Sequence, residues 1–202
     1  MHKKKVYGYV LWLLLPLKLL AWSGPEVNEP DTDAAHAAYL KAEAAIEGKD
    51  LATAATQLRL AHQGYAQAGT WKQAFVAGHD LLQCFYYLGT YDSALSLIPQ
   101  LEGVLRMHAG VVTDSMEGNF FADCMAIHAK HGALEQAEAA LKRAVAAYER
   151  HPDPLYSRSA MANLYQQAAY NFGGEGTWDR SLAFEKANLE LLATFPPDTF
   201  QM

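Results

Sequence analysis

The sequence predicts an all-α protein, an α-solenoid in which about four antiparallel helical hairpins stack in chain order. A short turn phrase recurs along its 202 residues, apolar residues repeat at helical spacing, and no segment alternates with period two over a strand's length. A single hairpin cannot bury the apolar stripes of both its helices, so neighbouring hairpins have to cover them. Apolar residues make up 51% of the chain, enough to build such a core.

The turn phrase is the clearest of these observations. Residues 89–95 read Gly-Thr-Tyr-Asp-Ser-Ala-Leu, similar segments begin at Gly69, Gly132 and Gly176, and a weaker copy begins at Asp50. Each copy follows one apolar stretch and opens another, so we expect the glycines to end the preceding helix in the left-handed conformation. The side-chain oxygens expected to cap the following helices are those of Asp50, Thr70, Thr90 and Thr177.

Helical spacing predicts eight helices that pair in order as four hairpins. In the expected helix that covers residues 70–88, the residues Trp71, Phe75, Leu82 and Phe85 fall at offsets 0, 4, 11 and 14 and form a single apolar stripe. The expected helices cover residues 32–47, 51–68, 70–88, 91–108, 113–131, 133–150, 155–172 and 178–195.

Prolines mark the breaks in this pattern. A His-Pro-Asp-Pro segment at residues 151–154 separates the third hairpin from the fourth, and Pro196 with Pro197 stops the last helix. Pro99 is different, because it lies about two turns inside an expected helix. An interior proline costs about 3 kcal/mol, so we expect a bend near residues 95–99 or a helix that restarts there.

Both ends of the chain differ from the repeats. Residues 1–23 combine a basic start, an apolar run and a small-x-small segment, which is typical of a secretory signal peptide. An uncleaved N-terminal membrane anchor is the alternative, although Pro16 and Lys18 disfavour a longer span. Residues 24–31 form a polar linker, residues 32–195 the helical repeat domain and residues 196–202 a tail.

The charge balance bears on the partner. The chain has 16 Lys and Arg against 22 Asp and Glu, and removal of residues 1–23 takes away four lysines and no acid, leaving a net charge of about -10. A surface this acidic repels a polyphosphate backbone, so nucleic acid is excluded as the expected partner.

At Gly89, Tyr91 and Ala94 the chain resembles a tetratricopeptide repeat. That family places a glycine, an aromatic residue and an alanine at this spacing, where two helices turn on each other. Leu82 and Phe85 match apolar positions of the preceding helix. The resemblance implies a right-handed α-solenoid of the tetratricopeptide type.

The resemblance covers roughly residues 33–195 but departs from the family in period. The repeat here is 40 to 44 residues long, against about 34 in the usual unit. The match is weaker at Gly132, where Leu134 replaces the aromatic, and stronger at Trp178 and Ser181. Units of this longer kind look like the arrays found in bacterial signalling proteins.

In the family, positions on the first helix of each hairpin line a concave groove that binds a peptide. The corresponding set here is polar and aromatic, and tyrosine offers contact area and a hydrogen bond at low entropic cost, which suits peptide recognition. Core packing is the alternative for the tyrosines. The expected groove residues are Tyr39, Glu43, His79, Asp80, Gln83, Tyr86, Tyr87, Asn119, Asp123, Lys130, Asn163, Gln166, Gln167 and Tyr170. The set lacks the lysines with which some family members hold a C-terminal carboxylate, which disfavours that partner.

Two residue sets contain side chains of the types that metal binding or catalysis requires. Cys124, His128 and His131 fall at offsets 0, 4 and 7 and could offer ligands to zinc, but no fourth ligand is evident, so ordinary packing is favoured. His79 and Asp80 are adjacent in sequence and cannot face each other across a helix.

No hydrolase elbow, zinc-protease pair or phosphate loop occurs in the sequence, so we expect no catalytic residue, metal or cofactor. Cys84 and Cys124 are expected to be buried thiols, with a disulfide as the alternative that an export signal permits.

These observations predict an exported scaffold, periplasmic or extracellular, that is not an enzyme and binds another protein or peptide. A membrane would be involved only through an uncleaved leader. The alternative is a sensory or regulatory repeat fragment of a larger bacterial signalling protein whose partner domain is of the caspase-like or histidine-kinase type.

Overall fold

A computed structural model describes residues 32–173 and 177–195, which form eight α-helices and no strand. The all-α prediction is confirmed, and every expected helix is present with its ends shifted by three residues or fewer. The helices are α1 (Asp33–Glu47), α2 (Leu51–Gln67), α3 (Trp71–Leu88), α4 (Tyr91–Met107), α5 (Asp114–Lys130), α6 (Leu134–Glu149), α7 (Pro154–Asn171) and α8 (Trp178–Leu192).

The expected leader, linker and C-terminal tail lie outside the described residues. Of the helices that are described, none has both the length and the apolar character that crossing a bilayer requires.

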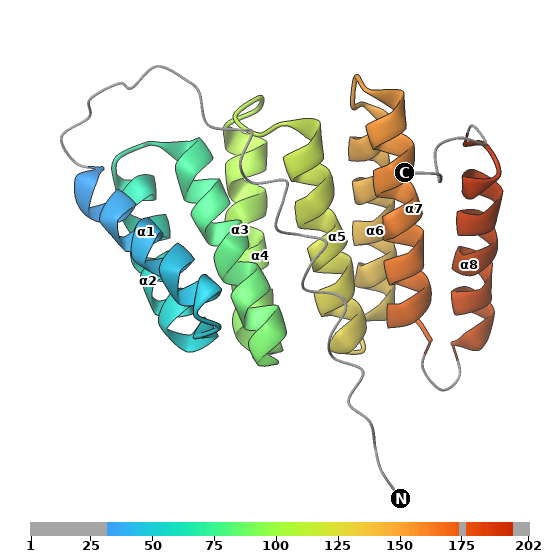
Figure 1. Cartoon of the computed structure of the whole chain (residues 1–202), viewed down its shortest axis with the longest axis horizontal. Coiled ribbons are helices and arrows are strands. Elements are labelled where there is room, and N and C mark those ends of the chain that lie inside the picture. Colours follow the sequence, from blue (N-terminus) through green and yellow to red (C-terminus); the bar gives the residue numbers. More distant parts are fainter. Residues whose placement is uncertain (1–31, 174–176, 196–202) are drawn as a thin grey trace, which may run out of the picture. The chain divides into compact units, whose positions relative to one another are not determined.

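The helices pack in chain order. Each helix contacts the next one along the chain, and the alternate pairs α3–α5 and α5–α7 also touch. Figure 1 shows α1, α3, α5 and α7 in the nearer layer, with α2, α4 and α6 behind them. Packing between sequential neighbours is what the repeated amphipathic pattern requires, because each hairpin needs the next one to cover its second stripe.

The main hydrophobic core draws buried residues from α1 through α7, and Phe184 of α8 packs against it. Large side chains fill its middle. The rings of Phe75 on α3 and Phe120 on α5 meet edge to face, with centroids 5.5 Å apart. A smaller cluster, made of Ala35, Ala38, Ala61, Tyr65, Ala74 and Ala77, joins α1, α2 and α3.

The recurring turn phrase forms one backbone motif. Gly69, Gly89 and Gly132 have φ angles of 74°, 72° and 82°, which confirms the left-handed conformation expected of them. At each, the N–H of the following residue bonds to a carbonyl five residues back, as when the Thr90 N–H reaches Phe85 at 2.9 Å. This is the Schellman closure of a helix C-terminus. Gly176 lies outside the described residues.

The threonine caps were predicted wrongly. The hydroxyl of Thr70 donates to the carbonyl of Tyr65 at 3.0 Å, and that of Thr90 donates to Phe85 at 3.2 Å, so both close the preceding helix. Thr177 likewise donates to Phe172. At Thr70 and Thr90 the reason is that a residue following a left-handed glycine already lies over the last carbonyls of the preceding helix. Asp50 does cap the next helix, since its carboxylate accepts from the Thr53 N–H at 3.1 Å.

Helix α4 runs unbroken from Tyr91 to Met107 with Pro99 inside it. The alternative of a helix that restarts at this proline is therefore wrong, while the expected bend stays a prediction. Pro99 is exposed to solvent. Proline has no N–H, so the carbonyl four residues before it lacks an intrahelical donor and can be hydrated instead.

Candidate functional site

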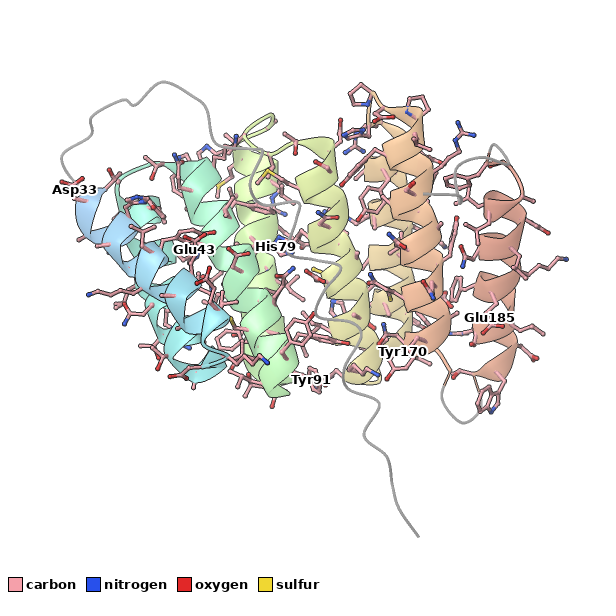
Figure 2. The ribbon with its side chains drawn as sticks, in the orientation of Figure 1. Asp33, Glu43, His79, Tyr91, Tyr170 and Glu185 are labelled. Atoms are coloured by element: carbon pink, nitrogen blue, oxygen red, sulfur yellow. The ribbon has the colours of Figure 1, made fainter. Side chains whose placement is uncertain are left out.

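The fourteen residues expected to line a groove all lie on α1, α3, α5 and α7, and we call the surface that they form the odd-helix face. Figure 2 shows Glu43, His79 and Tyr170 on this nearer layer of helices. Their contacts divide the face into two parts. On one part the side chains join neighbouring helices, and on the other they are exposed.

Tyr39 joins α1 to α3. Its hydroxyl donates to Oδ2 of Asp80 at 2.7 Å, and Asp80 is only 7% exposed. Burial, followed by the charge of the Asp80 carboxylate, raises the pKa of Tyr39 far above its ordinary value. The phenol therefore stays protonated and serves as a fixed donor to a buried carboxylate.

Asp123 joins α5 to α3. Its Oδ2 accepts a hydrogen bond from Nε2 of Gln83 at 2.9 Å and lies 2.8 Å from Nε2 of His79. The His79 ring also meets Phe120 edge to face, with centroids 5.9 Å apart. His79 is thus paired with Asp123, and its sequence neighbour Asp80 with Tyr39, so the structure forms no His79–Asp80 pair.

The exposed part of the face lies at the C-terminal ends of α5 and α7. Nζ of Lys130 lies 4.7 Å from the centre of the Tyr170 ring, a cation–π distance, and Tyr170 is 75% exposed. Within the described structure, the exposed side chains of Asn163, Gln166 and Gln167 make no hydrogen bond.

Tyr86 and Tyr87 extend this part onto α3. Their rings meet edge to face with centroids 5.3 Å apart, and Tyr87 is 45% exposed. Burial raises the pKa of Tyr86 to about 12, with smaller contributions from its neighbours, Tyr170 among them. Burial also raises the pKa of Tyr87. Tyr86 and Tyr87 are therefore neutral phenols at physiological pH.

Two of the expected residues stand apart. Oδ1 of Asn119 accepts a hydrogen bond from the Tyr148 hydroxyl on α6 at 2.7 Å, so its side chain is engaged with an even-numbered helix. Glu43 is exposed on α1, where its charge helps to raise the pKa values of Tyr39 and Tyr65.

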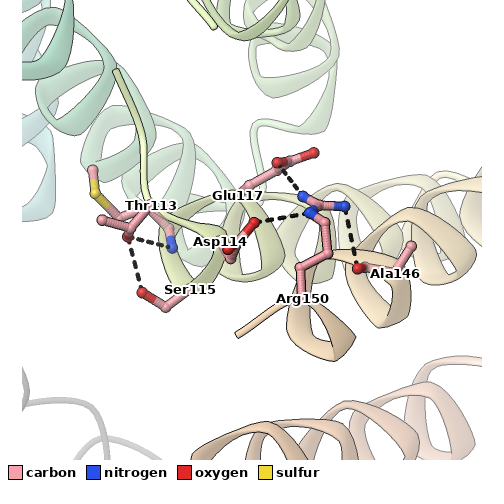
Figure 3. A network of polar contacts seen from close by, with 7 residues as sticks. Thr113, Asp114, Ser115, Glu117, Ala146 and Arg150 are labelled. Atoms are coloured by element: carbon pink, nitrogen blue, oxygen red, sulfur yellow. Dashed lines mark hydrogen bonds and ion pairs between the residues drawn. The ribbon is translucent and has the colours of Figure 1, made fainter. Parts of the chain in front are cut away.

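An ionic contact within the third hairpin was not predicted from the sequence. Arg150 at the end of α6 donates from Nε to Asp114 at 2.8 Å and from Nη2 to Glu117 at 2.6 Å, both in the first turn of α5 (Figure 3). A third bond reaches the carbonyl of Ala146 at 3.2 Å. Antiparallel pairing brings the end of one helix beside the start of the other, so opposite charges at those positions were the available signal.

The zinc alternative is not supported by the geometry. In the ranges that the structure covers, no three His, Cys, Asp or Glu side chains are grouped so that they could hold a metal ion. Burial raises the pKa of the Cys124 thiol, and burial lowers the pKa of His128, while His131 lies 3.3 Å from Asp92. Cys84 and Cys124 are both buried and no disulfide joins them, so the disulfide alternative is wrong.

Comparison with protein families, with curated proteins and with solved structures finds no match. The function therefore has to be inferred from the residues and their contacts.

Proposed function

We propose that this chain is an exported tetratricopeptide-like scaffold, a right-handed α-solenoid, that binds a protein or peptide segment on its odd-helix face. The packing of helices in chain order and the recurring turn phrase support the solenoid. The signal-like pattern in residues 1–23 supports export.

The exposed part of the odd-helix face carries this proposal. Tyr170 presents a largely exposed ring beside Lys130, and the amides of α7 next to it have unused donors and acceptors. A peptide needs both features, because its side chains bury area against an aromatic ring while its backbone needs hydrogen-bond partners. By contrast, Asp80 and Asp123 already serve the helix contacts. We therefore place the binding surface at the α3, α5 and α7 C-terminal ends.

The test is a selection of peptides from a displayed random library on the immobilised protein, followed by measurement of dissociation constants. Exposed aromatic residues are typical hot spots of interfaces. We expect Tyr170→Ala to weaken the selected peptides about tenfold or more, and Tyr87→Ala to weaken them less, because its ring is already partly covered.

The matched control is Trp178→Ala, which removes another exposed aromatic ring, 67% exposed, from the first turn of α8, a helix that contributes no residue to the odd-helix face. The selected peptides should bind this variant with dissociation constants within about twofold of those for the unmodified protein. A library that yields no binder, or binders that tolerate Tyr170→Ala and Tyr87→Ala as well as Trp178→Ala, would show that the odd-helix face is not the site.

A further inference from the structure

A cleft of about 460 Å³ lies between α2 and α4, with α3 as its floor. We call it the α2–α4 cleft. This volume falls in the range of about 300–1,000 Å³ that is typical of ligand sites. Its walls are mainly amides and hydroxyls and its floor is apolar. Among the residues that line it are Arg59, Gln63, Gln67, Leu81, Phe85 and Ser93.

The cleft is separate from the odd-helix face. At 100° per residue, Leu81 and Phe85 lie on the side of α3 opposite to His79 and Gln83. Both floor residues are buried, whereas the two polar residues are half-buried toward α5. A ligand in the α2–α4 cleft would therefore not touch the surface around Tyr170.

Arg59 is the one lysine or arginine among the residues that line the cleft, and no acidic residue lines it. Its guanidinium lies 5.7 Å from the centre of the Phe85 ring. Within residues 32–173 and 177–195 it forms no ion pair. In a chain with more acidic than basic residues, this leaves a cationic cleft with room for an anion.

A neighbouring cleft shows which anion fits this arrangement. It has a volume of about 180 Å³, lies between α4 and α6, and has α5 as its floor. There Arg143 lies over the Phe121 ring at 3.7 Å, and its guanidinium is ion-paired with the carboxylate of Glu102 from α4. An arginine over a phenylalanine thus already receives a glutamate side chain once in this protein.

We propose that the α2–α4 cleft binds the side-chain carboxylate of an aspartate or glutamate from a partner segment. Arg59 donates to the carboxylate through its fork of N–H groups, which matches carboxylate geometry. The amides of Gln63 and Gln67 and the hydroxyl of Ser93 serve the peptide groups on either side. Leu81 and Phe85 take the apolar flanking residues. This site is additional to the odd-helix face and does not depend on it.

The experiment uses the full chain and a blocked peptide, acetyl-Ala-Leu-Glu-Leu-Ala-amide, with a second peptide that has glutamine in place of glutamate. Binding is followed by the NMR shift of the arginine Nε–Hε signals and by the dissociation constants. We expect the glutamate peptide to bind about fivefold more tightly than the glutamine peptide, a preference that weakens in high salt.

Arg59→Gln should abolish this preference, and Arg59→Lys should keep only part of it, because an ammonium lacks the fork. The matched control is Arg106→Gln, which removes an exposed arginine from the last turn of α4 that lines neither cleft. Arg106→Gln and Tyr170→Ala should both leave the preference for the glutamate peptide unchanged. Failure of the proposed α2–α4 cleft site can therefore be distinguished from failure of the proposed binding site on the odd-helix face.

Equal binding of the two peptides, no binding of either, or a glutamate preference that survives Arg59→Gln would overturn the proposal. A third peptide, with glutamine inside and a free C-terminal carboxylate, tests the source of the charge. If it binds as well as the glutamate peptide, the assignment to a side-chain carboxylate is wrong.

Discussion

The middle of the helix series and its last helix, α8, are stabilised by different kinds of contact. In the middle, Phe75, Phe120 and Phe121 are fully buried. Helix α8 has one buried residue, Ser181, and it exposes Trp178, Leu182 and Leu189 by about two thirds each. Both segments carry apolar residues at helical spacing, so the difference lies in how many helices surround them.

Helix α8 is attached through a few specific contacts. The Ser181 hydroxyl donates to the carbonyl of Ala169 at 2.7 Å, Arg180 pairs with Glu138 at 3.1 Å, and Phe184 packs on Phe172 with ring centroids 5.1 Å apart. In a stack where most contacts join helices that are close in chain order, stability depends on local burial. We therefore expect the middle to unfold with the whole domain and α8 to open by itself.

The largest expected effect is that of truncating a ring in the middle. Phe120→Ala removes a fully buried side chain that contacts Phe75 and His79, and should lower the free energy of unfolding by about 3–5 kcal/mol. Leu189→Ala on α8 is the control and should change it by less than about 0.5 kcal/mol. Urea denaturation of both variants measures the difference, and similar losses would contradict the contrast between the two regions.

A smaller effect is expected where two helices approach closely. A Cβ at Gly118 on α5 would lie 2.4 Å from the ring of Tyr148, which is itself buried and bonded to Asn119. Overpacking costs about 1–3 kcal/mol, partly offset by about 1 kcal/mol from the higher helix propensity of alanine. We expect Gly118→Ala to lower the free energy of unfolding by about 1–2 kcal/mol.

Gly103→Ala on α4 is the matched control for this substitution. The added Cβ would meet only the end of Met107, at an ordinary 3.7 Å, so the propensity gain should remain and the protein should keep or gain stability. Thermal unfolding followed by circular dichroism compares the two variants. If both alanines destabilise equally, close approach at Gly118 is not the cause.

The helices could be predicted because their signals are local. Glycine closes a turn and apolar spacing marks a stripe wherever they occur, so the bounds of α3 and α6 followed from adjacent residues. The threonine caps were wrong because the turn phrase serves two helices at once. At Thr90 the backbone N–H and the hydroxyl both bond to a carbonyl at the end of α3, the preceding helix. The sequence alone does not show whether such a threonine bonds to the preceding or to the following helix.

The candidate site was predictable only in part, because its contacts join residues about 40 positions apart. Tyr39 and Asp80, or His79 and Asp123, were each expected on the right face. Which of them pair depends on the register between helices, which no single helix specifies. The exposure of α8 was likewise hidden, since Leu182 and Leu189 have the spacing of core residues.

The smallest expected effect tests the attachment of α8 directly. Ser181→Ala removes the buried hydrogen bond to the Ala169 carbonyl, which should cost about 1 kcal/mol. Since α8 is expected to open by itself, the loss should appear as hydrogen exchange about fivefold faster in the amides of residues 178–192, with α3 and α5 unchanged.

Ser96→Ala is the control for this substitution, since the Ser96 hydroxyl is exposed and bonds only within its own helix, to the carbonyl of Ser93. It should leave exchange in α8 unaltered. If Ser181→Ala instead accelerates exchange uniformly across all eight helices, α8 belongs to the same cooperative unit as the middle. The contrast between a core-packed centre and a polar-attached end would then describe the contacts but not the stability.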